Sequence, residues 1–155
     1  MTNKYGKIAL ILMIVLATVI VSGCIGGDTT NDKFTKEVSV GGVTFFLPDG
    51  YNLQTSDKSG NVETHVYDNG NDVIGISFAP ISIEQSLSNV KSDSSFSNIQ
   101  EDVSFAGYSG FTAVFTTGDS LKIKYFIFEK SGKVFMISVS NEANFEEYVP
   151  KIIGN

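Results

Sequence analysis

The sequence predicts an α+β domain, mainly an antiparallel sheet with two packed helices, after an N-terminal signal peptide. Turn signals such as Gly41-Gly42 and Asn69-Gly70 join short β-type segments. Apolar residues alternate along 121–130, as in a strand with a covered face. Two segments, near 83–93 and 142–152, have helical apolar spacing. Because tight turns join neighbouring strands and no parallel crossover is required, we expect an antiparallel sheet.

Length and composition favour one packed domain. A chain of 155 residues that is 42% hydrophobic, with twelve Phe, can bury a core without staples. It contains one cysteine, which excludes an internal disulfide. Stability must therefore come from packing.

The N-terminal segment has the order of a secretory signal peptide. Lys4 and Lys7 precede fourteen residues, 8–21, of which Thr18 is the one polar member, and the small residues Ser22 and Gly23 follow. A helix of that length covers roughly 21 Å, short of the ~30 Å hydrocarbon core of a membrane. Extension through residue 25 gives roughly 27 Å, so a membrane span stays open as an alternative.

Val21-Ser22-Gly23-Cys24 resembles the lipobox of prokaryotic lipoprotein signal peptides, and all four positions match that pattern. The resemblance implies that a lipid is attached to the Cys24 thiol and that residues 1–23 are cleaved off. Two acyl chains anchor a protein stably where one does not. An uncleaved transmembrane anchor and an ordinary secreted protein remain the alternatives.

Residues 24–36 are predicted to form a flexible tether, and residues 37–155 the globular domain. The segment 26–32 is small and polar without apolar periodicity. This organisation predicts a protein anchored to the cell membrane by lipid and facing outside the cytoplasm.

The first half of the domain is predicted as two hairpins and a helix. Ser82 and Gln85 form a capping box that begins a helix with the stripe Ile83, Leu87 and Val90, ending near Asp93. The elements before it, in order, are a hairpin of 37–40 and 43–47, a turn at 48–50, a short extended piece at 51–55, a polar loop at 56–61, and a hairpin of 62–67 and 73–78.

The second half is predicted as a run of strands and a final helix. Asn141 is a good N-cap, and Pro150 should kink or end the helix near its middle. The strands before it are 99–106, 111–117, 121–130 and 134–140, with turns at 107–110, 118–119 and 131–132.

The domain resembles the PsbP-like group of small proteins. The resemblance rests on the hairpin that ends in 45–51, on the strand run 111–140 and on the acidic-aromatic segment 144–148. Archaeal surface lipoproteins of this build are the members it resembles most. The resemblance implies binding or scaffolding more than catalysis, and it assigns no functional residue.

Catalytic and metal-ligating residues are sparse. His65 is the one histidine, and strand alternation places it on one face with Glu63 and Tyr67. A surface or half-buried histidine is the simpler interpretation, and a catalytic base the alternative. Zinc sites need several His or Cys. We therefore expect no catalytic set, cofactor or metal.

Three acidic groups have weaker functional interpretations. The segment 68–72 has two Asp but lacks the Gly and Glu positions of an EF-hand loop, so a turn is favoured over a metal loop. The adjacent pairs Glu101-Asp102 and Glu146-Glu147 should point apart as solvated surface.

The aromatic residues are interpreted mainly as core. A pocket or partner-binding patch is the alternative for four of them: Tyr51, Tyr108, Phe126 and Phe128. From Cys24 onward nine lysines, and no arginine, face seventeen acids, a formal charge of −8. That balance argues against nucleic-acid partners.

Together these features predict a membrane-anchored extracytoplasmic lipoprotein that acts as a binding or accessory module for a small ligand or a protein partner. A structural envelope component and an envelope enzyme are the alternatives.

Overall fold

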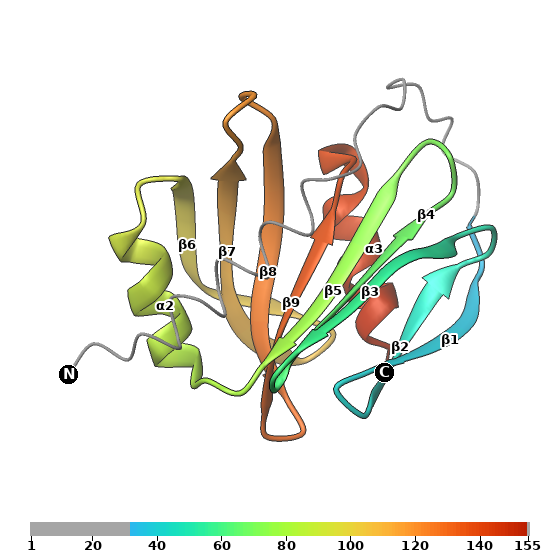
Figure 1. The fold of residues 1–155 in the computed structure, drawn as a ribbon, viewed down its shortest axis with the longest axis horizontal. Coiled ribbons are helices and arrows are strands. Elements are labelled where there is room, and N and C mark those ends of the chain that lie inside the picture. The colour runs from blue at the N-terminus through green and yellow to red at the C-terminus, as the bar shows by residue number, and fades with distance from the viewer. Residues whose placement is uncertain (1–31, 155) are drawn as a thin grey trace.

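The computed structural model describes residues 32–154 and confirms the α+β class with a mostly antiparallel sheet (Figure 1). A seven-stranded antiparallel sheet has the order β3-β4-β5-β9-β8-β7-β6, and β1 and β2 form a separate hairpin. The expected signal peptide, Cys24 and most of the tether lie outside the described residues. Neither described helix is both long and apolar enough to cross a membrane.

The strands are β1 (Phe34–Val40), β2 (Val43–Pro48), β3 (Asn52–Ser59), β4 (Val62–Asp68), β5 (Val73–Ala79), β6 (Phe96–Phe105), β7 (Tyr108–Thr116), β8 (Lys122–Lys130) and β9 (Lys133–Val139). The helices are α2 (Ile83–Ser92) and α3 (Glu142–Ile153).

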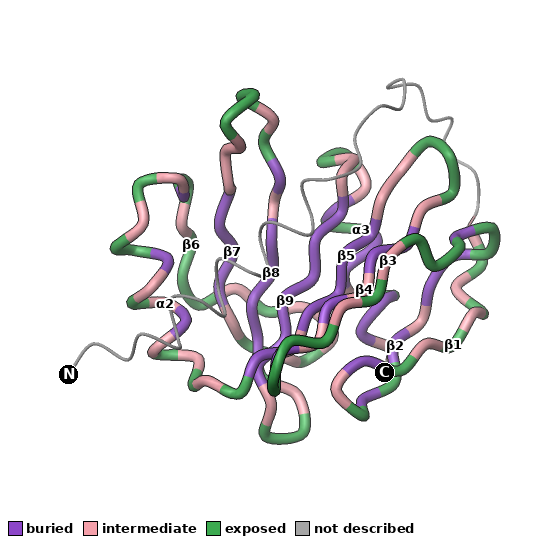
Figure 2. The backbone as a smooth tube through the Cα atoms, in the orientation of Figure 1, coloured by how far each residue is buried: buried purple, intermediate pink, exposed green. Residues whose placement is uncertain are grey.

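The sheet separates two hydrophobic clusters. On one face, here called the α3 face, α3 and the β1–β2 hairpin pack against the central strands. On the opposite face, the α2 face, α2 lies against β6, β7 and β8. Figure 2 shows the buried residues concentrated on the central strands, with exposure at the turns. The core is therefore a sheet covered on both sides.

Strand β8 shows why the sequence pattern predicted this arrangement. Ile123, Tyr125 and Ile127 belong to the cluster on the α2 face, whereas Phe126 and Phe128 are fully buried on the α3 face. The expectation that one end of the second face is covered and the other wet is confirmed, because Lys122 is exposed.

The β1–β2 turn is held closely against the sheet. Gly41 has a φ of +58°, and a Cβ at this position would lie 2.8 Å from a ring carbon of Phe78. Lys133 Nζ donates a hydrogen bond to the Gly41 carbonyl at 2.6 Å. The predicted glycine turn is confirmed, and β1 begins at Phe34 rather than at residue 37.

The predicted polar loop at 56–61 is wrong for residues 56–59, which belong to the edge strand β3, whereas residues 60–61 form the turn to β4. The strand pairs with β4 from Asn52 to Ser59. Its side chains are exposed or half-buried throughout. Apolar alternation is absent because neither face of this edge strand is covered.

The β6–β7 hairpin also differs from the prediction. Its turn lies at Ala106-Gly107, both with positive φ, and β7 begins at Tyr108 inside the predicted turn 107–110. Strand β6 begins at Phe96, before the predicted start at 99, and two register shifts interrupt its pairing. Irregular pairing obscured its periodicity.

The prediction that Pro150 could end the last helix near its middle is wrong. Helix α3 continues to Ile153, and the Pro150 carbonyl accepts a hydrogen bond from Gly154 at 3.2 Å. Both Ile152 and Ile153 are fully buried, so packing compensates for the amide donor that proline lacks. Lys130 Nζ binds the Ile153 carbonyl at 2.6 Å and caps the last turn. The Asn141 cap and the Ser82–Asp93 bounds of α2 are confirmed.

Candidate functional site

His65 lies between two polar partners on its own strand. Its Nε2 is 3.0 Å from a carboxylate oxygen of Glu63, and its Nδ1 is 3.0 Å from the hydroxyl of Tyr67. Alternation on β4 puts all three side chains on the α3 face. The side chains of His65 and Glu63 are 15% and 20% exposed, so the group is half-buried but reachable.

The chemistry of these partners fixes the proton arrangement. A carboxylate can only accept, so Nε2–H donates to Glu63. In the neutral imidazole Nδ1 is then an acceptor, and the Tyr67 hydroxyl donates to it. Burial and the nearby Glu63 charge raise the pKa of Tyr67 to about 12. We call these three residues the Glu63–His65–Tyr67 relay. Within the described chain, Glu63 and Tyr67 are the titratable residues that contact His65.

A second concentration of polar groups crosses the α2 face of the sheet. Antiparallel register places Tyr125 opposite Ser138, and Thr64 opposite Ser77. All four residues are buried, and directly opposed side chains in such pairs have Cβ atoms about 5 Å apart. We call these four residues, on the adjacent strands β8, β9, β5 and β4, the hydroxyl strip.

The hydroxyl strip contains a buried group without a hydrogen bond. The Tyr125 hydroxyl has no partner within the described chain, and burial raises the pKa of this phenol. A buried, unpaired polar atom is rare in native proteins and calls for an explanation. Small residues lie near the Tyr125 ring on the neighbouring strands. Ala113 on β7 is paired with Tyr125, and Gly75 on β5 is paired with Ser138. Hydroxyls among apolar and small side chains are the usual lining of a small-molecule site.

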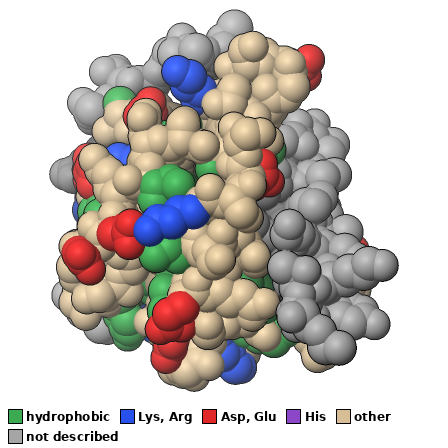
Figure 3. All heavy atoms as spheres, turned by 90° about the vertical axis from the view of Figure 1, so that its left-hand side faces the viewer, with side chains coloured by type: hydrophobic (Ala, Val, Ile, Leu, Met, Phe, Trp, Pro, Cys, Tyr) green, Lys and Arg blue, Asp and Glu red, His purple; other side chains and the backbone are tan. Residues whose placement is uncertain are grey.

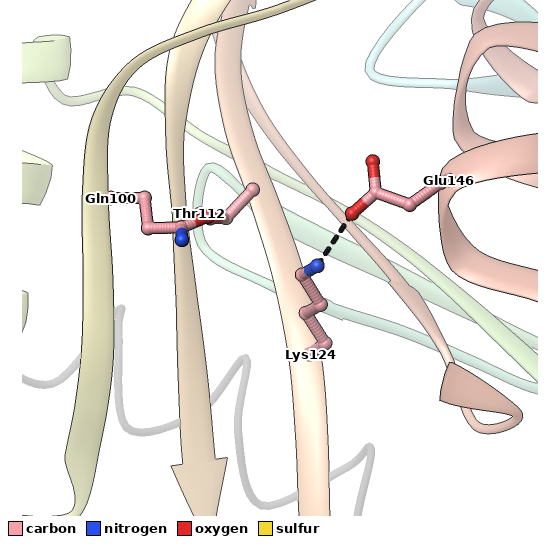
Figure 4. Close-up of polar contacts among 4 residues, drawn as sticks. All are labelled: Gln100, Thr112, Lys124 and Glu146. Carbon is pink, nitrogen blue, oxygen red and sulfur yellow. Dashed lines mark hydrogen bonds and ion pairs between the residues drawn. The ribbon is translucent and has the colours of Figure 1, made fainter. Parts of the chain in front are cut away.

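On the α3 face, polar side chains of β6, β7 and β8 lie beside α3 (Figure 4). Lys124 Nζ is 2.6 Å from a carboxylate oxygen of Glu146 and 4.7 Å from the centre of the Phe145 ring. On the neighbouring strands, Thr112 donates to Gln100 at 3.4 Å. These contacts fasten α3 to β8 and pair β6 with β7, which is a structural role.

The acidic groups singled out from the sequence make local contacts. Asp68 accepts a hydrogen bond from the Gly70 amide, and Asn69 accepts from two amides at 2.8 and 2.9 Å, as in a turn. Glu101 pairs with Lys91 at 2.5 Å, and Glu147 with Lys151 at 2.6 Å. The members of the predicted surface pair 146–147 therefore have different partners, and in the described chain no three His, Cys, Asp or Glu converge to hold a metal.

Three of the four aromatic candidates are core residues. Phe126 and Phe128 stack at 4.9 Å, and both are fully buried with Tyr51 in the cluster of the α3 face. Tyr108 is partly buried against the same cluster. The side of the molecule that carries α2 and β6 shows hydrophobic side chains between charged groups (Figure 3). It includes the partly buried Ile83, Leu87 and Ile99 and the Lys91–Glu101 ion pair.

Sequence reasoning missed Tyr125 and the partners of His65. Tyr125 occupied an apolar position in the alternation of β8, and so was interpreted as ordinary core. The shared face of Glu63, His65 and Tyr67 was visible in the sequence, but not the contacts among them. Cys24 lies outside the described residues.

Comparison with family models, with curated proteins and with solved structures finds no match to this chain.

Proposed function

We propose that this protein is a membrane-anchored, extracytoplasmic lipoprotein whose domain is a binding or accessory module. The lipobox-like Val21-Ser22-Gly23-Cys24 supports the anchor, with the lipid on Cys24. The observation that carries the binding role is the unpartnered hydroxyl of Tyr125 within the hydroxyl strip. In this proposal a small, mainly apolar ligand with one hydrogen-bonding group occupies the α2 face and pairs with that hydroxyl.

A PsbP-like domain is the finer form of the proposal. The hairpin that ends at 45–51, the strands β7 to β9 and the acidic-aromatic helix α3 support it, because they follow one another in the order that the resemblance implies. A group that serves mainly in binding and scaffolding is consistent with an accessory role.

The anchor is tested by expressing the full chain in a prokaryotic host with a radiolabelled lipid precursor. We expect the wild type to carry the label and to associate with membranes. Its mass should be that of a lipidated chain that begins at residue 24. Cys24→Ser should lose both label and cleavage, whereas Thr29→Ser, a control in the tether, should keep them. Label that persists in Cys24→Ser excludes the lipobox interpretation, and an unlabelled wild type of full mass supports a membrane span instead.

The binding role is tested by native mass spectrometry of the purified protein after gentle extraction from membranes. We expect a co-purifying small molecule on the wild type, with occupancy reduced at least several-fold in Tyr125→Phe. Tyr108→Phe is the matched control, because it removes a phenol from the other face. Equal occupancy in the two variants, or none in the wild type, contradicts the assigned site.

The relay favours an envelope enzyme as the second candidate. A histidine held between a carboxylate and a phenol can accept and return a proton. An activity that His65→Gln abolishes and that changes with the protonation of the imidazole would favour this candidate over the binding module.

A further inference from the structure

The tip of the β4–β5 hairpin carries the one Asn-Gly dipeptide of the chain, Asn69-Gly70. Asn69, Gly70 and Asn71 are exposed, and Figure 2 shows this exposure at the tip of the hairpin. Gly70 has a φ of +91°, a left-handed conformation that glycine adopts without strain. Because glycine has no side chain, its main-chain nitrogen is little hindered when it approaches a neighbouring group.

The side chain of Asn69 is folded forward over Gly70. Its Oδ1 accepts hydrogen bonds from the main-chain amides of Asn71 at 2.9 Å and of Asp72 at 2.8 Å. The ring that the first of these bonds closes contains both the carboxamide carbon Cγ of Asn69 and the main-chain nitrogen of Gly70. Two amide donors on one carbonyl oxygen polarise Cγ, and they stabilise the negative charge that the oxygen gains when a nucleophile adds.

The main-chain nitrogen of Gly70 is bound to a base. Its N–H donates to Oδ1 of Asp68, the last residue of β4. A carboxylate that accepts from an N–H increases the electron density on the nitrogen, and it can take the proton as that nitrogen forms a new bond. The loop therefore places a base, a nucleophile and a polarised carbonyl on three consecutive residues, Asp68, Gly70 and Asn69, that are already joined by hydrogen bonds.

We propose that Asn69 is a site of self-catalysed deamidation, at which the loop converts its own carboxamide to a carboxylate. The Gly70 nitrogen forms a bond to Cγ of Asn69 and gives its proton to Asp68, and the bond from Cγ to Nδ2 breaks. The same proton leaves with Nδ2 as ammonia, and a cyclic succinimide remains. Water then opens the succinimide at either carbonyl, which gives aspartate or isoaspartate at position 69. The net reaction consumes one water and releases one ammonia.

The reaction changes both the charge and the main chain of the loop. Either product adds a negative charge to the stretch between Asp68 and Asp72. Isoaspartate also inserts a methylene into the main chain, in a loop that is joined to α3 by the hydrogen bond from Asn144 Nδ2 to Asp72 Oδ2 at 3.4 Å. Since the loop supplies its own base and nucleophile, the converted fraction would increase with the age of the molecule.

The simpler role of these three hydrogen bonds is to form a turn. In that role they hold Asn69 in one conformation, so folding should protect its carboxamide and the unfolded chain should deamidate faster. A loop that promotes the reaction has the opposite effect, because the base and the polarised carbonyl are in place only when the protein is folded. The two roles therefore predict opposite effects of folding on the rate of deamidation.

The test incubates the full chain in detergent and mildly alkaline buffer, with and without denaturing urea. Peptide mapping by mass spectrometry follows the conversion of the amide at position 69 to the acid. We expect conversion to be at least several-fold faster in the folded protein than in urea. Asn61 is the internal control, because it is exposed in a turn but is followed by the β-branched Val62, and it should keep its amide. Conversion that is absent, or no faster than in urea, overturns the proposal.

Variants test the role of the base and the identity of the site. Asp68→Ala removes the acceptor of the Gly70 N–H, so it should slow conversion several-fold in the folded protein. Asp119→Ala, in the exposed turn between β7 and β8, is the matched control and should convert as the wild type does. Asn69→Ser should lose the new acidic species in isoelectric focusing. Undiminished conversion in folded Asp68→Ala, or an acidic species that persists in Asn69→Ser, overturns the assignment, and the comparison with urea decides alone if Asp68→Ala does not fold.

Discussion

The hydroxyl of Tyr67 lies 3.0 Å from Nδ1 of His65 and donates to it, because the Glu63 carboxylate keeps the proton of the chain's one histidine on Nε2. On the other side of the ring, Glu63 accepts from Nε2 at 3.0 Å. Protonation of the imidazole would force the phenol to change from donor to acceptor. The proton state of His65 is therefore coupled to the orientation of a buried hydroxyl.

Tyr67→Phe should destabilise the protein by about 1 kcal/mol at mildly alkaline pH. It removes the hydrogen bond to Nδ1 and leaves the ring packed in the core. Urea unfolding measures the change. Tyr108→Phe is the control, because no hydrogen bond of its hydroxyl is present among the described residues, and it should unfold near the wild-type midpoint. An unchanged midpoint in Tyr67→Phe would show that water replaces the phenol at no cost.

Stability should fall steeply above about pH 10. Burial raises the pKa of Tyr67 to about 12 and raises those of Tyr51, Tyr125 and Tyr148 above their ordinary value of 10.0. From about pH 10 upward the unfolded chain loses protons that the native protein retains, so the free energy of unfolding decreases. Urea midpoints from about pH 9 to about pH 11 test this, and the tyrosinate absorbance of these four residues should appear together with unfolding. Absorbance in the folded protein near pH 10 that corresponds to more than two of the six tyrosines would contradict the burial of these phenols.

Asp72 should make a contribution of the same sign on the acid side, because its pKa is also raised in the folded protein. Its pKa is raised above 3.8, first by burial, so the folded protein binds this proton more readily than the unfolded chain. The wild type should therefore gain stability relative to Asp72→Asn as the pH falls through the raised pKa, and the benefit is lost at neutral pH. Paired urea titrations measure the difference. If the stability of Asp72→Asn instead rises relative to that of the wild type as the pH falls, the predicted sign is wrong.

Gly110→Ala should cost about 3 kcal/mol by overpacking. A Cβ at Gly110 would lie 2.1 Å from the main-chain oxygen of Ile127, and a paired strand cannot move away cheaply. Gly118→Ala is the matched control, since nothing lies within 4 Å of its added Cβ. It should change stability by less than about 0.5 kcal/mol. Thermal or urea unfolding of both variants checks the contrast.

Pro150→Ala should stabilise the protein by about 1 kcal/mol. The alanine amide restores the hydrogen bond to the Glu146 carbonyl that proline cannot make. The greater flexibility of the unfolded chain offsets part of this gain. Urea unfolding checks it, and a loss of stability would mean that the proline ring contributes packing that alanine cannot replace.

The sequence predicted the fold class because the alternation of residues along a covered strand, such as β8, shows which side chains face the core. It did not predict β3, since an edge strand with exposed side chains has the composition of a loop. It also could not give the strand order, because the pairing of β5 with β9 depends on contacts between segments about sixty residues apart.

The candidate sites were predictable only in part. The shared face of Glu63, His65 and Tyr67 follows from alternation, but the distances do not. Tyr125 looked like an ordinary core residue, and Tyr51 was one of four aromatic residues with a pocket as the alternative. What distinguishes these two tyrosines is a missing hydrogen bond, which only three-dimensional packing reveals. Asp72 was interpreted as part of a turn because its partners in α3 lie far along the chain.

The pairing of β5 with β9 has a consequence for biogenesis. The middle of the sheet is completed by a strand from the end of the chain, and α3 follows it with its last two isoleucines fully buried. A nascent chain that has emerged only as far as β8 lacks the element that joins the two halves of the sheet. The two halves of the sheet therefore cannot join until β9 has emerged, so the domain should complete its folding late and as one unit.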